Sequence, residues 1–337
     1  MPRVTVGMPT FKRADYLAHS IPLVLHQTFK DFELIICDDA SPDSTADVVQ
    51  RFKDPRIRYY RNPENLKIPR ILNHILELAT GELIIILHDH DIFHPELLER
   101  MVRFFDTHSH IGFVHPGVAW VDPDGGNYRE LLCDFKGVTR GRDLAKAILM
   151  SKDFSCPITA CSMVPRRAYE KVGFRYDEDF GFLSDMDLWL RLAIHYDVGY
   201  LREPLLTCRM RDAAHEYSGV NWQIIEWAVS IFCVNIQRHF ESDSGTLQSA
   251  IKLWTQKRDR YYWQSILAAA AQADLPSFRK GLKISHAKSK IGLRFISKIL
   301  LALYPCHPVL MYFGFKLSQG IKAFKRFVHS NAVATFF

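Results

Sequence analysis

Apolar residues occur along the first half of the chain as short runs that have the lengths of buried β-strands, and helical patterns separate these runs. The predicted strands cover residues 4–10, 32–37, 57–60 and 83–87. The predicted helices, where apolar residues recur every three or four positions, cover 15–26, 44–52 and 69–78. Strands and helices that alternate in this way predict an α/β fold with a doubly wound, mostly parallel sheet, flanked by helices and joined by right-handed crossovers.

The second half of the chain changes character near residue 220. Before that point, the pattern predicts strands or extended segments at 111–121 and 160–164, a tight turn at 122–126, and helices at 140–150, 166–172 and 185–195. Beyond it, the pattern is mainly helical and rich in aromatic residues. We therefore expect a helical C-terminal extension that begins near residue 221.

Composition indicates the size of the core and the cellular compartment that we expect for the protein. The chain has 337 residues and 48% hydrophobic content, which is enough for a sizeable core. Its seven cysteines are odd in number, scattered and never spaced as Cys-x-x-Cys, so we expect reduced thiols rather than a disulfide framework or a zinc knuckle. The first residues enter a strand pattern directly, which does not resemble a signal peptide. These features predict a cytoplasmic protein.

Positive charge is concentrated at the C-terminal end. Residues 276–337 hold eleven Lys and Arg and no Asp or Glu. The first 275 positions therefore contain 32 of the 43 basic residues and all 37 acidic residues, so this part of the chain is net acidic. The apolar stretch 299–315 is too short to span a membrane and contains two prolines. We expect 276–337 to contact an anionic membrane surface peripherally. A helical cap on the preceding domain is the alternative, and nucleic-acid binding is not expected.

Candidate chemistry lies where predicted strands end. The strand at 83–87 is followed by His88, Asp89, His90 and Asp91, and the strand at 32–37 by Asp38 and Asp39. In open α/β sheets, ligands bind beyond the carboxyl ends of the strands. Carboxylates there can hold Mg²⁺ or Mn²⁺ together with a substrate phosphate. The alternative is that they cap the following helices. For Asp185 and Asp187 the alternative is a favourable interaction of first-turn carboxylates with the helix dipole.

The order of several motifs resembles a known family. Residues 4–10, 27–29 and 32–41 look like the start of family 2 inverting glycosyltransferases of the GT-A fold and the bacterial surface-polysaccharide type, and the likeness covers about residues 2–220. Asp89-His90-Asp91 resembles the Asp-x-Asp metal motif of that family, and Ser184-Asp185 its Glu-Asp base motif. Further positions that sit as they usually do in the family are Asn65, Arg70, Asn73 and Gly81-Glu82.

The resemblance implies roles for individual residues. Asp185 would be the general base that takes the proton of the acceptor hydroxyl. The residues that would bind the nucleotide-sugar are Pro9, Thr10, Arg13, Asp38, Asp39, Arg70, Asp89, His90 and Arg211. The ligands of a Mn²⁺ or Mg²⁺ cofactor would be Asp89, Asp91 and His215. The sequence departs from the family pattern at His88, His90 and Ser184, where acidic residues are usual.

These expectations combine into one functional hypothesis. The chain would be a metal-dependent inverting hexosyltransferase that moves a sugar from a nucleotide-sugar, expected to be a UDP-sugar, to a hydroxyl of a lipid-linked or polysaccharide acceptor in cell-surface glycan synthesis. A catalytic domain at 1–220, with a nucleotide-binding half at 1–110 and an acceptor half at 111–220, would precede the basic extension at 221–337, and the protein would lie at the cytoplasmic face of the membrane.

Two alternatives stay open at this point. One is a zinc-dependent hydrolase that uses His88, His90 and His94 as ligands, although their spacing matches no hydrolase signature. The other is a module that binds a nucleotide-sugar without catalysis.

Overall fold

The computed structural model describes residues 1–121, 129–132, 137–151, 158, 161–209, 222–271 and 274–288. Contacts within the chain group its residues into two units. The first comprises 1–147 and 156–211, and the second comprises 148–155 and 212–337. The boundary predicted near 220 falls within 210–221, which lies outside the described residues, so the division of the chain at that point stays a prediction.

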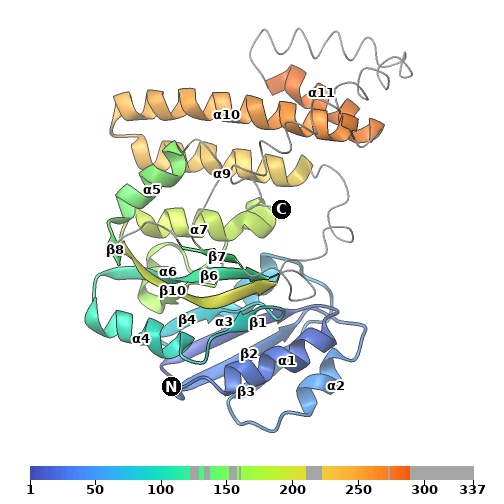
Figure 1. Cartoon of the computed structure of the whole chain (residues 1–337), viewed down its shortest axis with the longest axis vertical. Coiled ribbons are helices and arrows are strands. Elements are labelled where there is room, and N and C mark those ends of the chain that lie inside the picture. Colours follow the sequence, from blue (N-terminus) through green and yellow to red (C-terminus); the bar gives the residue numbers. More distant parts are fainter. Residues whose placement is uncertain are drawn as a thin grey trace. The chain divides into compact units, whose positions relative to one another are not determined.

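Four parallel strands form the N-terminal half of the sheet in the first unit, as predicted. They are β1 (Val4–Thr10), β2 (Phe32–Asp38), β3 (Ile57–Arg61) and β4 (Leu83–Ile86), and they lie in the order β3-β2-β1-β4. The helices between them are α1 (Ala14–Leu25), α2 (Thr45–Gln50) and α3 (Arg70–Leu78). Figure 1 shows these helices beside the strands that they connect. The predicted elements agree with the observed ones to within a few residues.

Antiparallel pairings enter the sheet only beyond β4. There β9 (Met163–Pro165) lies between β4 and β6 (Ile111–Val121), and β6 runs parallel to β10 (Asp197–Arg209). The shorter strands β5 (Ile92–Phe93), β7 (Arg129–Leu131) and β8 (Val138–Thr139) pair antiparallel with β10, β6 and β10 respectively. The fold class is therefore the predicted α/β, with a mixed sheet.

The remaining helices of the first unit include two that were absent from the predicted elements, one α-helix and one 3₁₀ helix. They are α4 (Leu97–Thr107), α5 (Gly141–Met150), which reaches into the second unit, α6 (Arg166–Lys171), the 3₁₀ helix η1 (Glu178–Leu183) and α7 (Ser184–Ala193). Helix α4 was not predicted although its buried residues recur at helical spacing. Strand β10 was not predicted because Arg202, Glu203 and Pro204 interrupt its apolar pattern, and the register with β6 shifts at that point.

Alternation along β1 explains how helices cover both faces of the sheet. Val4, Val6 and Met8 point to one face and belong to a buried cluster that includes apolar residues of α1 and α4. On the opposite face, Gly7 lies directly beneath Ile75 of α3, and a Cβ atom built on Gly7 would come within 2.4 Å of that side chain. The missing side chain lets α3 approach the strand whose end carries the candidate site.

We predict that Gly7→Ala lowers the free energy of unfolding by about 1–3 kcal/mol, because the added methyl group overpacks the contact with Ile75. Urea unfolding followed by circular dichroism measures the change. Gly137→Ala is the matched control, because a Cβ atom there meets nothing within 4 Å. Equal stabilities for the two variants would contradict this account of the α3 contact.

The second unit is helical in its described part. Helices α9 (Trp222–Phe240), α10 (Ser244–Ala271) and α11 (Leu275–Lys288) share a core that includes Trp222, Tyr262 and Leu282. Within the part of the chain that the structure describes, no helix is both long enough and apolar enough to cross a membrane. Most of the basic segment 276–337 lies outside the described residues, and its predicted membrane contact stays a prediction.

Candidate active site

The carboxyl ends of β1 and β2 meet, and they bring the first candidate residues together. Thr10 and Asp38 are register partners, and the backbone N–H of Asp39 donates a hydrogen bond to the carbonyl oxygen of Thr10 at 2.9 Å. Pro9 is half-buried one position earlier on β1 and is paired with Cys37. Parallel strands thus place the predicted nucleotide-binding residues of both segments at one edge of the sheet.

Asp39 shapes the loop that faces this edge. One carboxylate oxygen accepts hydrogen bonds from the side-chain amide of Asn62 and the backbone N–H of Leu66, both at 2.8 Å, and the other accepts one from the backbone N–H of Lys67 at 2.9 Å. Asp39 therefore holds residues 62–67 in a fixed conformation. The side-chain amide that contacts Asp39 comes from Asn62.

Asp38 is buried and holds the turn that follows β2. Its carboxylate accepts hydrogen bonds from the backbone N–H of Ser41 at 2.8 Å and from the hydroxyl of Tyr59 at 2.6 Å. Burial, together with the hydrogen bond to Asp38, raises the pKa of Tyr59 far above its usual value, so the phenol remains a donor. These contacts give Asp38 a structural role, and the nucleotide contact predicted for it is untested.

Asp89 is almost completely buried and is surrounded by donors. Its Oδ2 accepts a hydrogen bond from the hydroxyl of Thr10 at 2.8 Å, and its Oδ1 lies 3.0 Å from Arg13 Nη1 and 3.0 Å from His90 Nδ1. Burial acts to raise the pKa of Asp89, but the hydrogen bonds from His90 and Thr10 and the charge of Arg13 outweigh it, so that the pKa lies below its usual value. Asp89 is therefore a buried anion that links β1, α1 and β4.

Two histidines flank Asp91. The imidazole rings of His88 and His90 are stacked, with centroids 5.5 Å apart. His88 Nδ1 lies 3.3 Å from Asp91 Oδ2, and His90 Nε2 lies 3.8 Å from Asp91 Oδ1. Burial lowers the pKa of His90 below its usual value, although the neighbouring carboxylates oppose the shift. His90 Nδ1 is also 2.9 Å from Arg13 Nη1, so in a given tautomer it accepts from Arg13 or donates to Asp89, not both.

Asp91 is the carboxylate of this segment that fits a divalent cation better. Both oxygens of Asp89 are engaged by strong donors, whereas the backbone N–H of Arg209 reaches Asp91 Oδ1 only at 3.4 Å and Cys208 Sγ lies 3.9 Å from Asp91 Oδ2. Because these contacts of Asp91 are long and weak, replacing them by a bond to a metal costs little free energy. The donor set therefore fits the Mn²⁺ or Mg²⁺ that the family resemblance implies, through Asp91 first.

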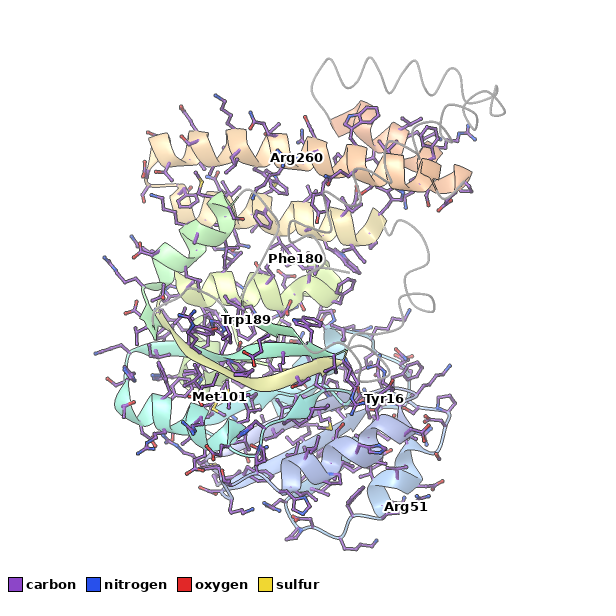
Figure 2. All side chains as sticks on the ribbon, in the orientation of Figure 1. Tyr16, Arg51, Met101, Phe180, Trp189 and Arg260 are labelled. Carbon is purple, nitrogen blue, oxygen red and sulfur yellow. The ribbon has the colours of Figure 1, made fainter. Side chains whose placement is uncertain are left out.

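A small cavity of about 150 Å³ opens beside Asp91. Its lining residues are Asp15, Tyr16, His19, Ser20, Leu23, His90, Asp91 and Arg209. Tyr16, labelled in Figure 2, comes from α1, and the ring of His90 lies edge-on to it at 6.4 Å. The α1 residues of this lining were not among the predicted site residues. Their signal in the sequence is the helical spacing of Tyr16, Ser20 and Leu23 on one side of α1.

Asp185 stands in the first turn of α7. It keeps some contact with solvent, but its carboxyl group lies in an enclosed environment that raises its pKa to about 6. The hydrogen bond from the backbone N–H of Met186, at 2.7 Å, and the charge of His88 act in the opposite direction. Trp189 on the same helix is buried against Phe113, with ring centroids 5.0 Å apart, and therefore anchors α7 to the sheet (Figure 2).

The other predicted site residues lie elsewhere or outside the described part of the chain. The side chain of Arg70, the first residue of α3, forms an exposed ion pair with Glu178 of η1, at 3.7 Å. This pair links α3 to the segment that leads into α7, and a contact of Arg70 with a nucleotide stays a prediction. Arg211 and His215 fall outside the described residues.

We predict that Asp185→Asn raises the free energy of unfolding above that of the wild type, and that this gain is larger at pH 7 than at pH 4. Because the folded state favours protonated Asp185, ionisation between pH 3.8 and about 6 lowers the free energy of unfolding of the wild type as the pH rises. The neutral amide escapes this loss, which we expect to be about 1–2 kcal/mol after allowance for solvent screening.

Urea unfolding at the two pH values measures the difference between variant and wild type. Asp143→Asn, which removes an exposed carboxylate from the first turn of α5, controls for the loss of a favourable helix-dipole interaction. A gain for Asp185→Asn that is the same at pH 4 and pH 7 would show that burial does not raise the pKa of Asp185.

Comparison with known proteins identifies the class that this fold and site define. The family model described as Glycosyl transferase family 2 matches residues 5–173. EpsE of Bacillus subtilis (strain 168) is 32% identical over 62% of this chain and 73% of its own length. The chain therefore belongs to the family 2 glycosyltransferases and is an enzyme of glycan synthesis.

Further similarities agree with this assignment. The GalNAc(5)-diNAcBac-PP-undecaprenol beta-1,3-glucosyltransferase of Campylobacter jejuni is 30% identical over 57% of this chain and 60% of its own length. The structure of Staphylococcus aureus TarS 1–349 in complex with UDP-GlcNAc aligns with a TM-score of 0.64 and 14% identity, and covers 93% of this chain and 89% of that one.

The mannosyltransferase PcManGT of Pyrobaculum calidifontis, in complex with GDP-Man and Mn²⁺, aligns with a TM-score of 0.52 and 18% identity over 93% of this chain and 85% of its own. At these identities the two structures bear on the fold alone. They confirm the GT-A-like α/β fold that the resemblance implied.

Proposed function

We propose that this enzyme transfers a sugar, with inversion, from a nucleotide-sugar to an acceptor hydroxyl, and that a divalent cation assists the departure of the nucleotide diphosphate. The observation that carries the proposal is the position of His88. Its Nδ1 lies 3.3 Å from Asp91, and its charge acts on the pKa of Asp185. This proximity supports the proposal that the metal ligand and the base act in one site.

The arrangement of residues at the edge formed by β1 and β2 supports a nucleotide site there. Asp39 and the loop that it holds would form one wall of the nucleotide site, and Thr10 and Pro9 would form its floor. We propose that the base and ribose lie here, with the diphosphate directed toward Asp91. UDP is the first candidate because TarS was captured with UDP-GlcNAc, and GDP is the second because PcManGT was captured with GDP-Man.

Asp91 would hold the cation, assisted by the donor diphosphate and by His215, which lies outside the described residues. The cation, when bound, supplies positive charge that stabilises the leaving diphosphate. Asp89, which the family resemblance also made a metal ligand, would instead position this region, because Thr10, Arg13 and His90 already engage its oxygens.

Asp185 would take the proton of the acceptor hydroxyl as the hydroxyl oxygen attacks the anomeric carbon. With a pKa of about 6, the carboxylate is mostly ionised at neutral pH and is still basic enough to accept a proton, which is the compromise that general base catalysis favours. Attack from the face opposite the departing diphosphate inverts the anomeric centre in a single displacement.

The acceptor is proposed from relatives and from charge. The related Campylobacter jejuni enzyme acts on a glycan linked to undecaprenol by a diphosphate, according to its name, so a lipid-linked or polysaccharide acceptor is the first candidate. The basic residues of 276–337 would keep the enzyme at an anionic, cytoplasmic membrane surface that carries such an acceptor.

The zinc-hydrolase alternative is not favoured. Among the described residues, the cluster of metal donors that contains His88 is completed by Asp91 and Cys161, not by His90 and His94. His94 is exposed, and its Nδ1 accepts the backbone N–H of Glu96 at 3.2 Å.

We predict release of UDP or GDP from one member of a panel of nucleotide-sugars in the presence of Mn²⁺ or Mg²⁺, and loss of this release in EDTA. Asp185→Asn should lower the rate by about 10²–10⁴-fold, because general base catalysis contributes that much, while nucleotide affinity stays within a factor of about two. Asp179→Asn, which removes an exposed carboxylate six positions earlier, is the control and should keep wild-type activity.

Two outcomes would overturn the proposed function. One is turnover that is unaffected by EDTA, which would remove the cation from the mechanism. The other is an Asp185→Asn variant that is as active as wild type. Binding of a nucleotide-sugar without turnover, in the presence of several acceptors, would instead support the non-catalytic alternative.

A further inference from the structure

A second set of metal donors shares Asp91 with the proposed donor-sugar site. One donor atom each from His88, Asp91 and Cys161 lies within 4.8 Å of the other two. The register of β4 and β9 explains the arrangement, because Leu83 pairs with Pro165 and Ile85 with Met163, and the same antiparallel register extended by two residues places Cys161 opposite Leu87. Cys161 therefore arrives beside His88 from a segment about 70 residues away in sequence.

The environment of these donors suits a bound cation. Cys161 and Asp91 are almost completely buried, whereas the side chain of His88 is 32% exposed, so an ion can enter from the side of the imidazole. The backbone of His88 also acts as a hydrogen-bond donor to the Cys161 sulfur, which agrees with the closeness of the two residues. Three donors of different type thus converge at the end of β4.

The chemistry of the set differs from that of the proposed Mn²⁺ or Mg²⁺ site. Hard cations take oxygen ligands, whereas an imidazole, a thiolate and a carboxylate together suit a borderline cation such as Zn²⁺ or Co²⁺. Bonds of about 2.0–2.3 Å in a tetrahedral zinc site place the ligand atoms about 3.3–3.6 Å apart. His88 Nδ1 and Asp91 Oδ2 already have a separation of this size, at 3.3 Å. Because all three donor atoms lie within 4.8 Å of one another, closing the site requires a shift of at most about 1.2 Å toward the sulfur.

We propose that His88, Asp91 and Cys161 form a binding site for a borderline divalent cation, with Zn²⁺ as the natural ligand and water in the fourth position. Binding releases the thiol proton of Cys161 to solvent, and the thiolate completes the site. Because both cations draw on the carboxylate of Asp91, we expect Zn²⁺ to compete with the cation that supports sugar transfer. This consequence, inhibition by Zn²⁺ that excess Mn²⁺ relieves, rests on the proposed function, whereas the binding site itself does not.

Titration of the full-length, nucleotide-free protein with Co²⁺ tests the site directly. A thiolate ligand produces a sulfur-to-cobalt charge-transfer band in the near ultraviolet, which carboxylate and imidazole ligands alone do not. We expect one equivalent of Co²⁺ to produce this band in the wild type and Zn²⁺ to abolish it by displacement. Cys161→Ser should eliminate the band, and His88→Ala should weaken Co²⁺ affinity at least tenfold.

Two other cysteines provide matched controls. Cys37→Ser removes a buried thiol of β2 whose sulfur approaches His74 and Asn62 instead. Cys208→Ser removes a thiol that lies 3.9 Å from Asp91 but outside the three-donor cluster. Both variants should keep the band. Loss of the band in Cys208→Ser and its survival in Cys161→Ser would overturn the assignment of the sulfur ligand.

Absence of the band in the wild type would overturn the proposal, and this result needs no variant to fold. Circular dichroism of each variant checks that a lost band does not reflect unfolding, and Cys161→Ala replaces Cys161→Ser if the latter is unfolded. The readout is independent of turnover. A wild-type band without sugar transfer would therefore count against the proposed function alone, and transfer without a band would count against the Zn²⁺ site alone.

Discussion

The buried charge of Asp89 is the constraint on which the rest of the site depends. A carboxylate in that position is tolerated only because Arg13, Thr10 and His90 compensate it. These contacts join the end of β1, the residue before α1 and the end of β4. Ser20 of α1 adds a hydrogen bond to the carbonyl oxygen of Asp89. Removal of the Arg13 charge would leave the buried anion with hydrogen bonds but without its ion pair, and breaking a buried ion pair typically costs about 3–5 kcal/mol.

The same constraint separates the roles of the acidic residues. Since the oxygens of Asp89 are engaged from within the fold, Asp91 is left as the carboxylate whose weak donors can give way to a cation. Asp185 differs from both, because its enclosed position raises its pKa to about 6. The pKa of Asp89, in contrast, is kept below its usual value by strong hydrogen-bond donors. Carboxylates with different environments can thus serve one reaction as a structural anion, a metal ligand and a base.

Local sequence patterns could predict the frame of this site but not its finer contacts. The apolar runs that form β1, β2 and β4 placed Asp39 and Asp91 at one edge, because parallel strands end on the same side. The pattern did not reveal that Asn62 holds Asp39, or that Cys161 approaches His88, since both depend on contacts between distant segments. Strand β10 was hidden by the polar residues at its register shift, and helix α4, although its spacing is visible, was not predicted.

The most direct test of this account is a crystal structure with Mn²⁺ and UDP, in which anomalous scattering locates the metal. The account predicts a manganese peak about 2 Å from a carboxylate oxygen of Asp91 and from diphosphate oxygens, with Arg13 still paired to Asp89. A metal bound to Asp89 with Arg13 displaced, or a nucleotide away from the loop that Asp39 holds, would contradict it.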